Sequence, residues 1–333
     1  MAAPDEARGW RQTLAPYAEP RLRRSTLDIA TSVGPYLVLF AAMLILVRAS
    51  FWPALLLALP AAGFLIRVFI VFHDCTHGSF MRSRRGNRWV GLVTGLLVWM
   101  PFRGWQHEHN VHHATAGNLD RRGVGDIKTL TVAEYRALSP WRRVGYRLFR
   151  NPIVMFGAGW LLVLVLKPRF VPRGSRLGVR NSILGTNVAI AVFVATICLL
   201  VGWRTFLIVQ TPIFLVAGAV GIWLFFVQHQ FEDTYWQTQE DWRYEEAALE
   251  GSSYLKLPRW LQFFSGNIGF HHVHHLSVGI PNYNLEAAHE SAERLHDVPQ
   301  LTVRDALRAT RLKLWDERTG RLVTFRDARA DFT

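Results

Sequence analysis

The 333-residue chain is half hydrophobic, only 19% of its residues are charged, and its mean hydropathy is positive, at +0.12. The apolar residues are concentrated in uninterrupted runs, which argues against two soluble domains and predicts an integral membrane protein. The net charge of +13 flanks these runs, so we expect contact with an anionic lipid surface or an acidic protein, and not with nucleic acid.

Four apolar runs are predicted to cross the membrane. Residues 1–31 before them are polar and Arg-bearing, and we expect them to form a cytoplasmic N-terminal segment. A crossing helix needs about 20 residues, which favours spans at about residues 32–47, 52–72, 183–201 and 206–227.

Two further apolar runs, 89–101 and 153–166, are short, and we interpret them as interfacial or re-entrant segments. If residues 153–166 crossed, the basic loop 167–180 would lie outside, against the positive-inside rule. The prediction is therefore an all-α integral membrane protein with four transmembrane helices in two hairpins, interfacial helices and a cytoplasmic helical cap that carries the histidine segments. Both termini would be cytoplasmic.

The chain after Val227 is soluble in character. Leu257–Phe264 mixes aromatic residues with Arg, which is typical of an interfacial segment. We expect a membrane domain over residues 32–285 and cytoplasmic C-terminal helices over residues 286–333. Helices are predicted at Asn284–His296 and Thr302–Glu317, the second with Thr302 as N-cap and Asp305 completing a capping box.

Histidine is the commonest metal-binding side chain, and three segments of this chain concentrate it. Residues 73–77 read HxxxH, and residues 109–113 and 271–275 read HxxHH. In HxxHH we expect positions i and i+3 to share one helix face and position i+4 to reach a second metal. With His229 at the end of the last span, the predicted ligands are His73, His77, His109, His112, His113, His229, His271, His274 and His275.

The remaining histidines are expected outside this set. We interpret His289 and His296 as ordinary surface residues, and His107 as a surface residue or a residue behind the ligands. The run from His271 to His275 contains a fourth histidine, His272, which we expect to hydrogen-bond a carboxylate. If this run departs from a helix, His272 could replace His271 as ligand.

So many imidazoles are too numerous for one tetrahedral zinc ion and too nitrogen-rich for magnesium or calcium, so the pattern predicts two first-row ions, with iron suited to oxygen chemistry. Acidic residues would orient the rings by hydrogen bonds. The candidates are Asp74, Glu108, Asp126, Glu232 and Asp233.

From about Phe72 to Leu285 the sequence resembles the integral-membrane fatty acid desaturases, in the bacterial acyl-lipid branch. The segments that carry this resemblance are Phe72-His-Asp-Cys-Thr-His-Gly-Ser-Phe80, Trp105-Gln-His-Glu-His-Asn-Val-His-His-Ala-Thr115, Gly125-Asp-Ile-Lys-Thr-Leu-Thr-Val-Ala-Glu-Tyr135, Gly266-Asn-Ile-Gly-Phe-His-His-Val-His-His-Leu276 and Ile280-Pro-Asn-Tyr283. The resemblance implies two iron ions bound by these histidines, O₂ as co-substrate, and removal of two hydrogens from an acyl chain.

The resemblance also implies an external electron carrier, ferredoxin or a b-type cytochrome, since the chain lacks a haem-binding His-Pro-Gly-Gly motif. Some relatives place an Asn four residues before the additional histidine, where this chain has Phe225. An acyl-lipid substrate would enter an apolar tunnel from the bilayer, in a bacterial inner membrane. A basic face would dock an acidic ferredoxin or contact anionic lipid; it comprises Arg82, Arg84, Arg85, Arg88, Arg142 and Arg143.

Two other functions were weighed against desaturation. A lipid or carotenoid hydroxylase or ketolase would share the same di-iron site, and only its product would distinguish it. A metal transporter would need polar ligands inside the membrane. The predicted spans carry almost no ionisable residue apart from Arg67, and the histidines lie at the span ends.

Overall fold

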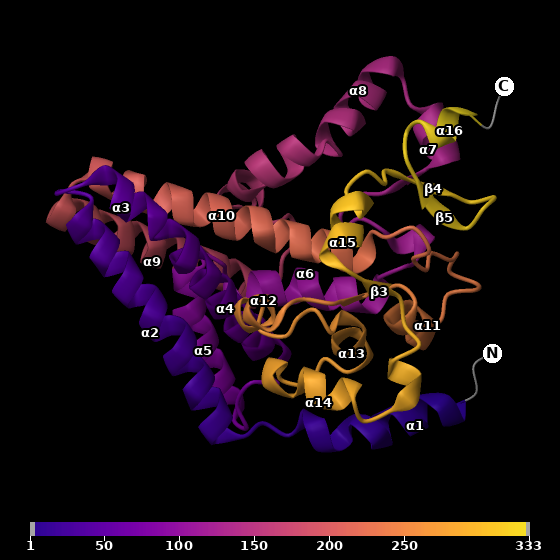
Figure 1. Cartoon of the computed structure of the whole chain (residues 1–333), viewed down its shortest axis with the longest axis horizontal. Coiled ribbons are helices and arrows are strands. Elements are labelled where there is room, and N and C mark those ends of the chain that lie inside the picture. The colour runs from indigo at the N-terminus through magenta and orange to yellow at the C-terminus, as the bar shows by residue number, and fades with distance from the viewer. Residues whose placement is uncertain (1–3, 331–333) are drawn as a thin grey trace.

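The computed structural model describes residues 4–330 and is almost entirely helical (Figure 1). Its helices are α1 (Pro4–Leu14), α2 (Leu22–Leu46), α3 (Phe51–Leu56), α4 (Ala58–His77), α5 (Arg84–Leu97), α6 (Phe102–Thr115), α7 (Val132–Ala137), α8 (Pro140–Phe149), α9 (Leu177–Val201), α10 (Trp203–His229), α11 (Tyr244–Leu249), α12 (Arg259–Phe264), α13 (His271–Leu276), α14 (Leu285–His289), α15 (Val303–Ala309) and α16 (Asp327–Ala330). Its short strands are β1 (Leu130–Thr131), β2 (Tyr254–Leu255), β3 (Gln300–Leu301), β4 (Leu314–Asp316) and β5 (Arg321–Val323).

Four helical stretches are long and apolar enough to cross a membrane: Leu22–Leu46, Phe51–His77, Leu177–Val201 and Trp203–His229. They confirm the four predicted spans, although the first helix begins at Leu22, well before the predicted residue 32. The predicted start at residue 32 rests on hydropathy, which shows where the apolar residues begin and not where the helix begins. The helix starts earlier because its first turns carry Ser25 and Asp28, which are buried against neighbouring elements.

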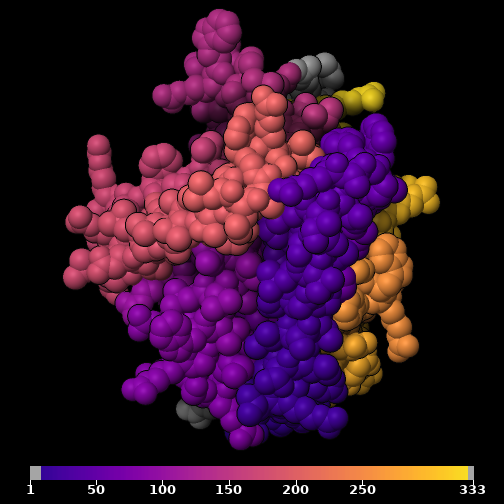
Figure 2. All heavy atoms as spheres, turned by 90° about the vertical axis from the view of Figure 1, so that its left-hand side faces the viewer, coloured from indigo at the N-terminus to yellow at the C-terminus, as the bar shows by residue number. Residues whose placement is uncertain are grey.

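These helices form one packed body. α2 packs along α4, α9 along α10, and α10 also lies against α4. Their facing side chains, including Val68, Phe72, Ile213 and Phe226, form the main hydrophobic core. Figure 2 looks onto the left-hand side of Figure 1 and shows this face covered by the indigo and purple atoms of the N-terminal helices and the pink and salmon atoms of the α9–α10 region. The C-terminal segment lies at its edge.

The two short apolar runs form separate elements beside this body. α5 packs on α4, and a Cβ atom at Gly95 would lie 3.0 Å from the Phe72 ring of α4 and 2.7 Å from the carbonyl oxygen of Met100, so both contacts favour glycine there. Residues 153–158 and 161–166 form two π-helical turns after α8. The pair Pro140–Phe149 and Ile153–Arg169 is bent by 62° and would add a fifth span if counted as one. The interfacial role of both runs stays a prediction.

The predicted C-terminal helices are partly wrong. Asn284–His296 is broken, because α14 ends at His289 and is flanked by 3₁₀ turns at Asn282–Asn284 and Glu293–Leu295. The second helix has the predicted capping box, in which the Asp305 backbone N–H donates to Thr302 Oγ1 at 3.3 Å and the Thr302 N–H to Asp305 Oδ2 at 3.1 Å. It ends at Ala309, however, because Leu314–Asp316 pairs as a strand.

The strand β4 joins distant parts of the chain. It pairs in parallel with β1, with Leu130 opposite Leu314, and antiparallel with β5, with Trp315 opposite Leu322. The turn before β5 contains Gly320 at a φ of +64°, a conformation that favours glycine. The C-terminal segment is thereby tied to the loop that follows α6.

Candidate metal centre

Four helices place the nine predicted histidines. His73 and His77 lie in the last turns of α4, and His229 is the last residue of α10. The other two segments lie on α6 and on α13, each of which is helical throughout its histidine motif. α4 ends where it does because Gly78 follows at a φ of +77°, the left-handed conformation that commonly terminates helices. The ends of two long helices therefore meet two short ones.

Nine imidazoles form two groups. What we call the first group comprises His73, His77, His109, His113 and His274. What we call the second group comprises His112, His229, His271 and His275. Within each group, one nitrogen per residue lies within 4.8 Å of the corresponding nitrogens of all the others. All nine predicted residues are brought together, and four helices contribute to them.

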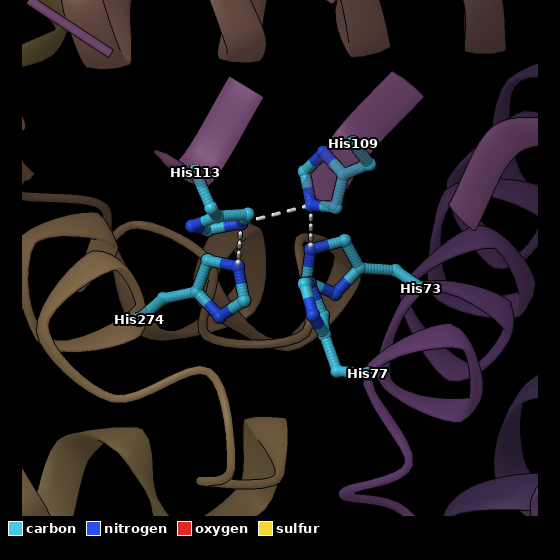
Figure 3. A group of neighbouring side chains, drawn as sticks. All are labelled: His73, His77, His109, His113 and His274. Atoms are coloured by element: carbon cyan, nitrogen blue, oxygen red, sulfur yellow. Dashed lines mark hydrogen bonds between the residues drawn. The ribbon is translucent and has the colours of Figure 1, made fainter. Parts of the chain in front are cut away.

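The first group is closely interlinked through Nε2 atoms (Figure 3). His109 Nε2 lies 3.0 Å from His73 Nε2 and 3.0 Å from His113 Nε2. His274 Nε2 lies 3.0 Å from His113 Nε2. The ring of His77 is 4.7 Å from that of His73 between centroids, and its buried Nε2 has no hydrogen-bond partner among the described residues.

The second group has the same character. His229 Nε2 lies 3.1 Å from His112 Nε2 and 2.9 Å from His271 Nε2. The ring of His275 is 4.6 Å from that of His229, and its Nε2 is also buried without a partner among the described residues. In both groups the nitrogens face one another and not ordinary hydrogen-bond acceptors.

The division of each HxxHH motif is the reverse of the predicted one. His109 and His113, at i and i+4, share the first group, whereas His112, at i+3, belongs to the second. In the other motif, His271 and His275 share the second group and His274 joins the first. At about 100° per residue, i+4 lies about 40° past position i and i+3 about 60° before it, so i+4 is the nearer neighbour in angle. The prediction that i and i+3 pair was wrong.

Buried neutral imidazoles suit metal ions. Burial lowers the pKa of His109, His113 and His274 well below the ordinary imidazole value, and neighbouring histidines lower it further. Burial lowers the pKa of His271 and His275 in the same way. A neutral ring offers one lone pair, and an unpaired buried nitrogen costs about 1–3 kcal/mol. The donor sets fit one transition-metal ion per group.

Hydrogen bonds at Nδ1 fix the orientation of three imidazole rings relative to their groups. His73 Nδ1–H donates to Asp74 Oδ1 at 2.9 Å, and His112 Nδ1–H donates to a carboxylate oxygen of Asp126. His229 Nδ1–H donates to the carbonyl oxygen of Gly251 at 3.0 Å. Each bond leaves the Nε2 lone pair directed into its group.

Two of the five predicted acids, Asp74 and Asp126, make these contacts. The other three candidates, among which the sequence did not allow a choice, make none of them. Lys167 Nζ lies 2.7 Å from Glu108 Oε2, so that carboxylate is paired at the surface. Arg321 lies 3.8 Å from a carboxylate oxygen of Glu232 and 2.9 Å from one of Asp233.

Asn282 is a contributor that we did not predict. Its backbone N–H and its Nδ2 donate to Asp74 Oδ2 at 2.7 and 3.0 Å, and Nδ2 also donates to Asp28 Oδ2 at 2.9 Å. Asp28 forms an ion pair with Arg67, whose Nε donates to Ser32 Oγ at 3.1 Å. A continuous polar network thus runs from inside the span helices to His73. The signals in the sequence were Asp28 and Arg67, two ionisable residues beside or within apolar runs.

The other histidines follow the predictions only in part. His107 is exposed, as one of its two predicted roles required. His272 lies outside both groups, but its partner is not a carboxylate: His272 Nε2 lies 3.0 Å from His289 Nδ1. His289 is buried and not on the surface, because its ring packs against Tyr254 and Phe270. His296 is exposed, as predicted.

The second group borders a small cavity of about 20 Å³, lined among others by His112, Asp126, Phe225 and His229. Phe225 lies one turn before His229 on α10, and its ring centroid is 5.0 Å from that of His112 and 5.6 Å from that of His229. This position is apolar, so it offers the second group packing and no hydrogen bond.

Comparison of the sequence with known proteins finds matches in the fatty acid desaturases. Residues 50–303 match the family model described as fatty acid desaturase. The chain is 46% identical to a fatty acid desaturase of Bacillus subtilis (strain 168), over 94% of this chain and 89% of the relative. It is 29% identical to an sn-1 oleoyl-lipid 12-desaturase and 30% identical to an sn-1 acyl-lipid omega-3 desaturase (ferredoxin), both of Synechocystis sp.. Each of these two matches covers 67% of this chain and 63% of the relative.

Proposed function

The chain belongs to the fatty acid desaturase family of oxidoreductases, and on this premise we propose that its nine clustered histidines hold two iron ions for the O₂-dependent insertion of a cis double bond into a membrane acyl lipid. The observation that carries this proposal is the division of the histidines into two buried groups of five and four. Each group would hold one ion, with His73, His77, His109, His113 and His274 on the first and His112, His229, His271 and His275 on the second.

Iron bound by such nitrogen-rich groups would supply the activation of O₂ and the removal of two hydrogens from an unactivated acyl chain. The protein's own contribution is to hold the rings. Asp74, Asp126 and the Gly251 carbonyl fix three of them with Nε2 directed inward. Register within α13 supports His271 as the ligand, because His272 faces His289 instead.

Aromatic side chains exclude water from the first group. Trp105 stacks on His109 with ring centroids 4.1 Å apart, and its ring lies 5.4 Å from that of Phe72, which is fully buried. An acyl chain arriving from the bilayer would meet this apolar wall. Since its methylenes are chemically alike, the bond to be oxidised is selected by position, and a shift of about 1 Å can cost roughly 100-fold in rate.

An acyl lipid as substrate and ferredoxin as donor are supported by the printed functions of the cyanobacterial relatives, one of which is named with ferredoxin. The exposed residues Arg82, Arg84 and Arg85 at the start of α5 offer a basic surface to an acidic carrier. Arg142 lies apart from them, on α8 (Figure 1). The same surface also suits anionic lipid. The positive-inside rule supports a location of this surface and of the histidines on the cytoplasmic side of a bacterial inner membrane.

Expression in a bacterial host without a desaturase tests the reaction. Gas chromatography of the fatty acid methyl esters should show new monounsaturated chains, and an oxygenated product without a new double bond would contradict desaturation. Elemental analysis of the purified chain should give about two irons per chain. A single zinc ion per chain would contradict the di-iron proposal.

A further inference from the structure

A third cluster of metal-binding side chains lies outside the two groups, at the end of α14. His289, Glu290 and His296 each offer a donor atom, and these atoms lie within 4.8 Å of one another. We propose that these three residues form a separate site for a labile transition-metal ion of the zinc class. α14 packs against α13, which carries histidines of both groups (Figure 1).

The donor set suits such an ion. Two imidazoles and one carboxylate, with water in the fourth position, form a known zinc set with bonds of roughly 2.0–2.2 Å, which places tetrahedral donors about 3.4 Å apart. His296 Nε2 already lies 3.7 Å from Glu290 Oε2, and the rings of His289 and His296 are 4.7 Å apart between centroids. Closing the site requires only small movements of surface side chains.

One ligand is rigid and two are accessible. The His289 residue is only 4% exposed, and its ring lies 4.8 Å from that of Tyr254 and 5.1 Å from that of Phe270. The side chains of Glu290 and His296 are 65% and 43% exposed, so an ion can enter from solvent. Burial lowers the pKa of His289, and His296 lowers it further, which favours the neutral ring that a metal needs.

His289 also connects this site to the histidines on α13. Its Nδ1 is occupied by His272 Nε2 at 3.0 Å, which leaves its own Nε2 for a metal. His272 stands between His271 of the second group and His274 of the first. A metal bound at the third site would therefore influence α13, the helix that supplies histidines to both groups. This coupling step rests on the proposed function.

Metal titration of the purified full chain, already loaded with iron, tests the binding step. Added Co²⁺ should bind as one further equivalent with a visible absorption band, while the iron content stays constant. His296→Ala and Glu290→Gln should each weaken this binding by more than about tenfold, since even residues behind metal ligands commonly contribute 10- to 100-fold. His107→Ala, which removes an exposed histidine elsewhere, should leave it unchanged.

Equal Co²⁺ affinity in the wild type and His296→Ala, or no further equivalent in the wild type, would overturn the site. The iron content reports on the proposed function independently, because a chain without iron can still bind Co²⁺ at His296. The coupling step has its own measurement: Zn²⁺ should slow desaturation in the wild type and lose most of this effect in His296→Ala. Equal inhibition of both would leave a metal site without coupling and overturn that step.

Discussion

The two histidine groups use the same donor atoms but are supported in different ways. Asp74, which holds His73 of the first group, is 2% exposed and has hydrogen bonds to both of its carboxylate oxygens. Asp126, which holds His112 of the second group, has a side chain that is 10% exposed, and its Oδ2 has no partner among the described residues. The second group also borders the small cavity, which the first group does not line.

This difference indicates that the first group is held more rigidly, whereas the second group is more accessible to small molecules. The first group is fixed by Asp74, Asp28 and Arg67 of the span helices and by Asn282, which lies in a 3₁₀ turn and hydrogen-bonds both acids. The second is held by a loop carboxylate and by the backbone carbonyl of Gly251, and it lies where a water-sized molecule can approach. We expect substitutions around the first group to disturb metal binding more strongly than equivalent ones around the second.

Removing one ligand from each group should have the largest effect. His113→Ala and His271→Ala should each reduce the new double bonds more than about 100-fold, a larger loss than the 10- to 100-fold typical of residues behind metal ligands. If the groups are separate sites, each variant should keep about one iron per chain, measured by elemental analysis. His107→Ala serves as a control with both irons. Two irons and full product in His113→Ala would remove that residue from the ligand set.

Substituting Asp74 and Asp126 should show directly in which group iron retention depends more on the supporting carboxylate. Asp74→Asn replaces one of the two accepting oxygens with an NH₂ group, which then faces the donor of either His73 or Asn282. We expect about 10- to 100-fold weaker iron retention. Asp126→Asn should cost less, since a cavity of about 20 Å³ is large enough for a compensating water. The rate at which each variant loses iron to a chelator measures the two effects. Faster loss from Asp126→Asn than from Asp74→Asn would contradict the stronger dependence of the first group on its carboxylate.

Substitution of Asn282 should disturb only the first group. Asn282→Leu removes Nδ2 and leaves Asp28 Oδ2 without its donor, at about 1–3 kcal/mol for a buried unsatisfied group. Asp74 Oδ2 loses one of its two donors and keeps the backbone N–H of residue 282. Thermal unfolding should show a lower midpoint. In a double-mutant cycle with Asp74→Asn the two effects should be less than additive, because both act on the same hydrogen bonds. Strict additivity would show that Asn282 does not act through Asp74.

Changing Phe225 should produce the smallest effect, confined to the second group. Phe225→Leu keeps an apolar side chain beside His112 and His229 but loosens the ring contacts. We expect unchanged iron content and a loss of product of less than about tenfold, because small displacements at a reacting centre cost rate and not binding. Quantitative gas chromatography measures it, and loss of iron would show that Phe225 supports the ligands themselves.

Patterns that depend on local periodicity were predictable from the sequence. Apolar runs predicted the four long helices, and helical spacing identified eight of the nine histidines that come together. The ninth, His229, was identified by its place at the end of the last apolar run. The finer pairing was predicted wrongly. The face shared by His109 and His113 follows from the helical step of about 100° per residue, so this pairing could have been predicted. Which histidines of other segments each face joins depends on how α6 is rotated against α4 and α13, and no spacing within one segment contains that rotation.

Contacts between distant segments were not predictable. Asn282 reaches Asp28 across the whole length of the chain, and His289 is buried because Tyr254 and Phe270 cover it. The strand at Leu314–Asp316 forms because β1 offers it a partner, although the segment alone looked helical. In each case the contact, the burial or the secondary structure depends on tertiary packing and not on the local sequence.

The pairing of β4 with β1 has a consequence for how the protein is made. Arg150 is fully buried and donates to the Gln230 side chain at 2.8 Å and to the carbonyl oxygen of Leu312, just before β4, at 3.1 Å. Leu312 is synthesised after the third histidine segment, which ends at His275. The membrane helices can therefore insert during translation, whereas the contacts of Arg150 beside His229 are complete only after residue 312 has been made. A ribosome stalled shortly after the third histidine segment would carry an inserted but unfinished enzyme.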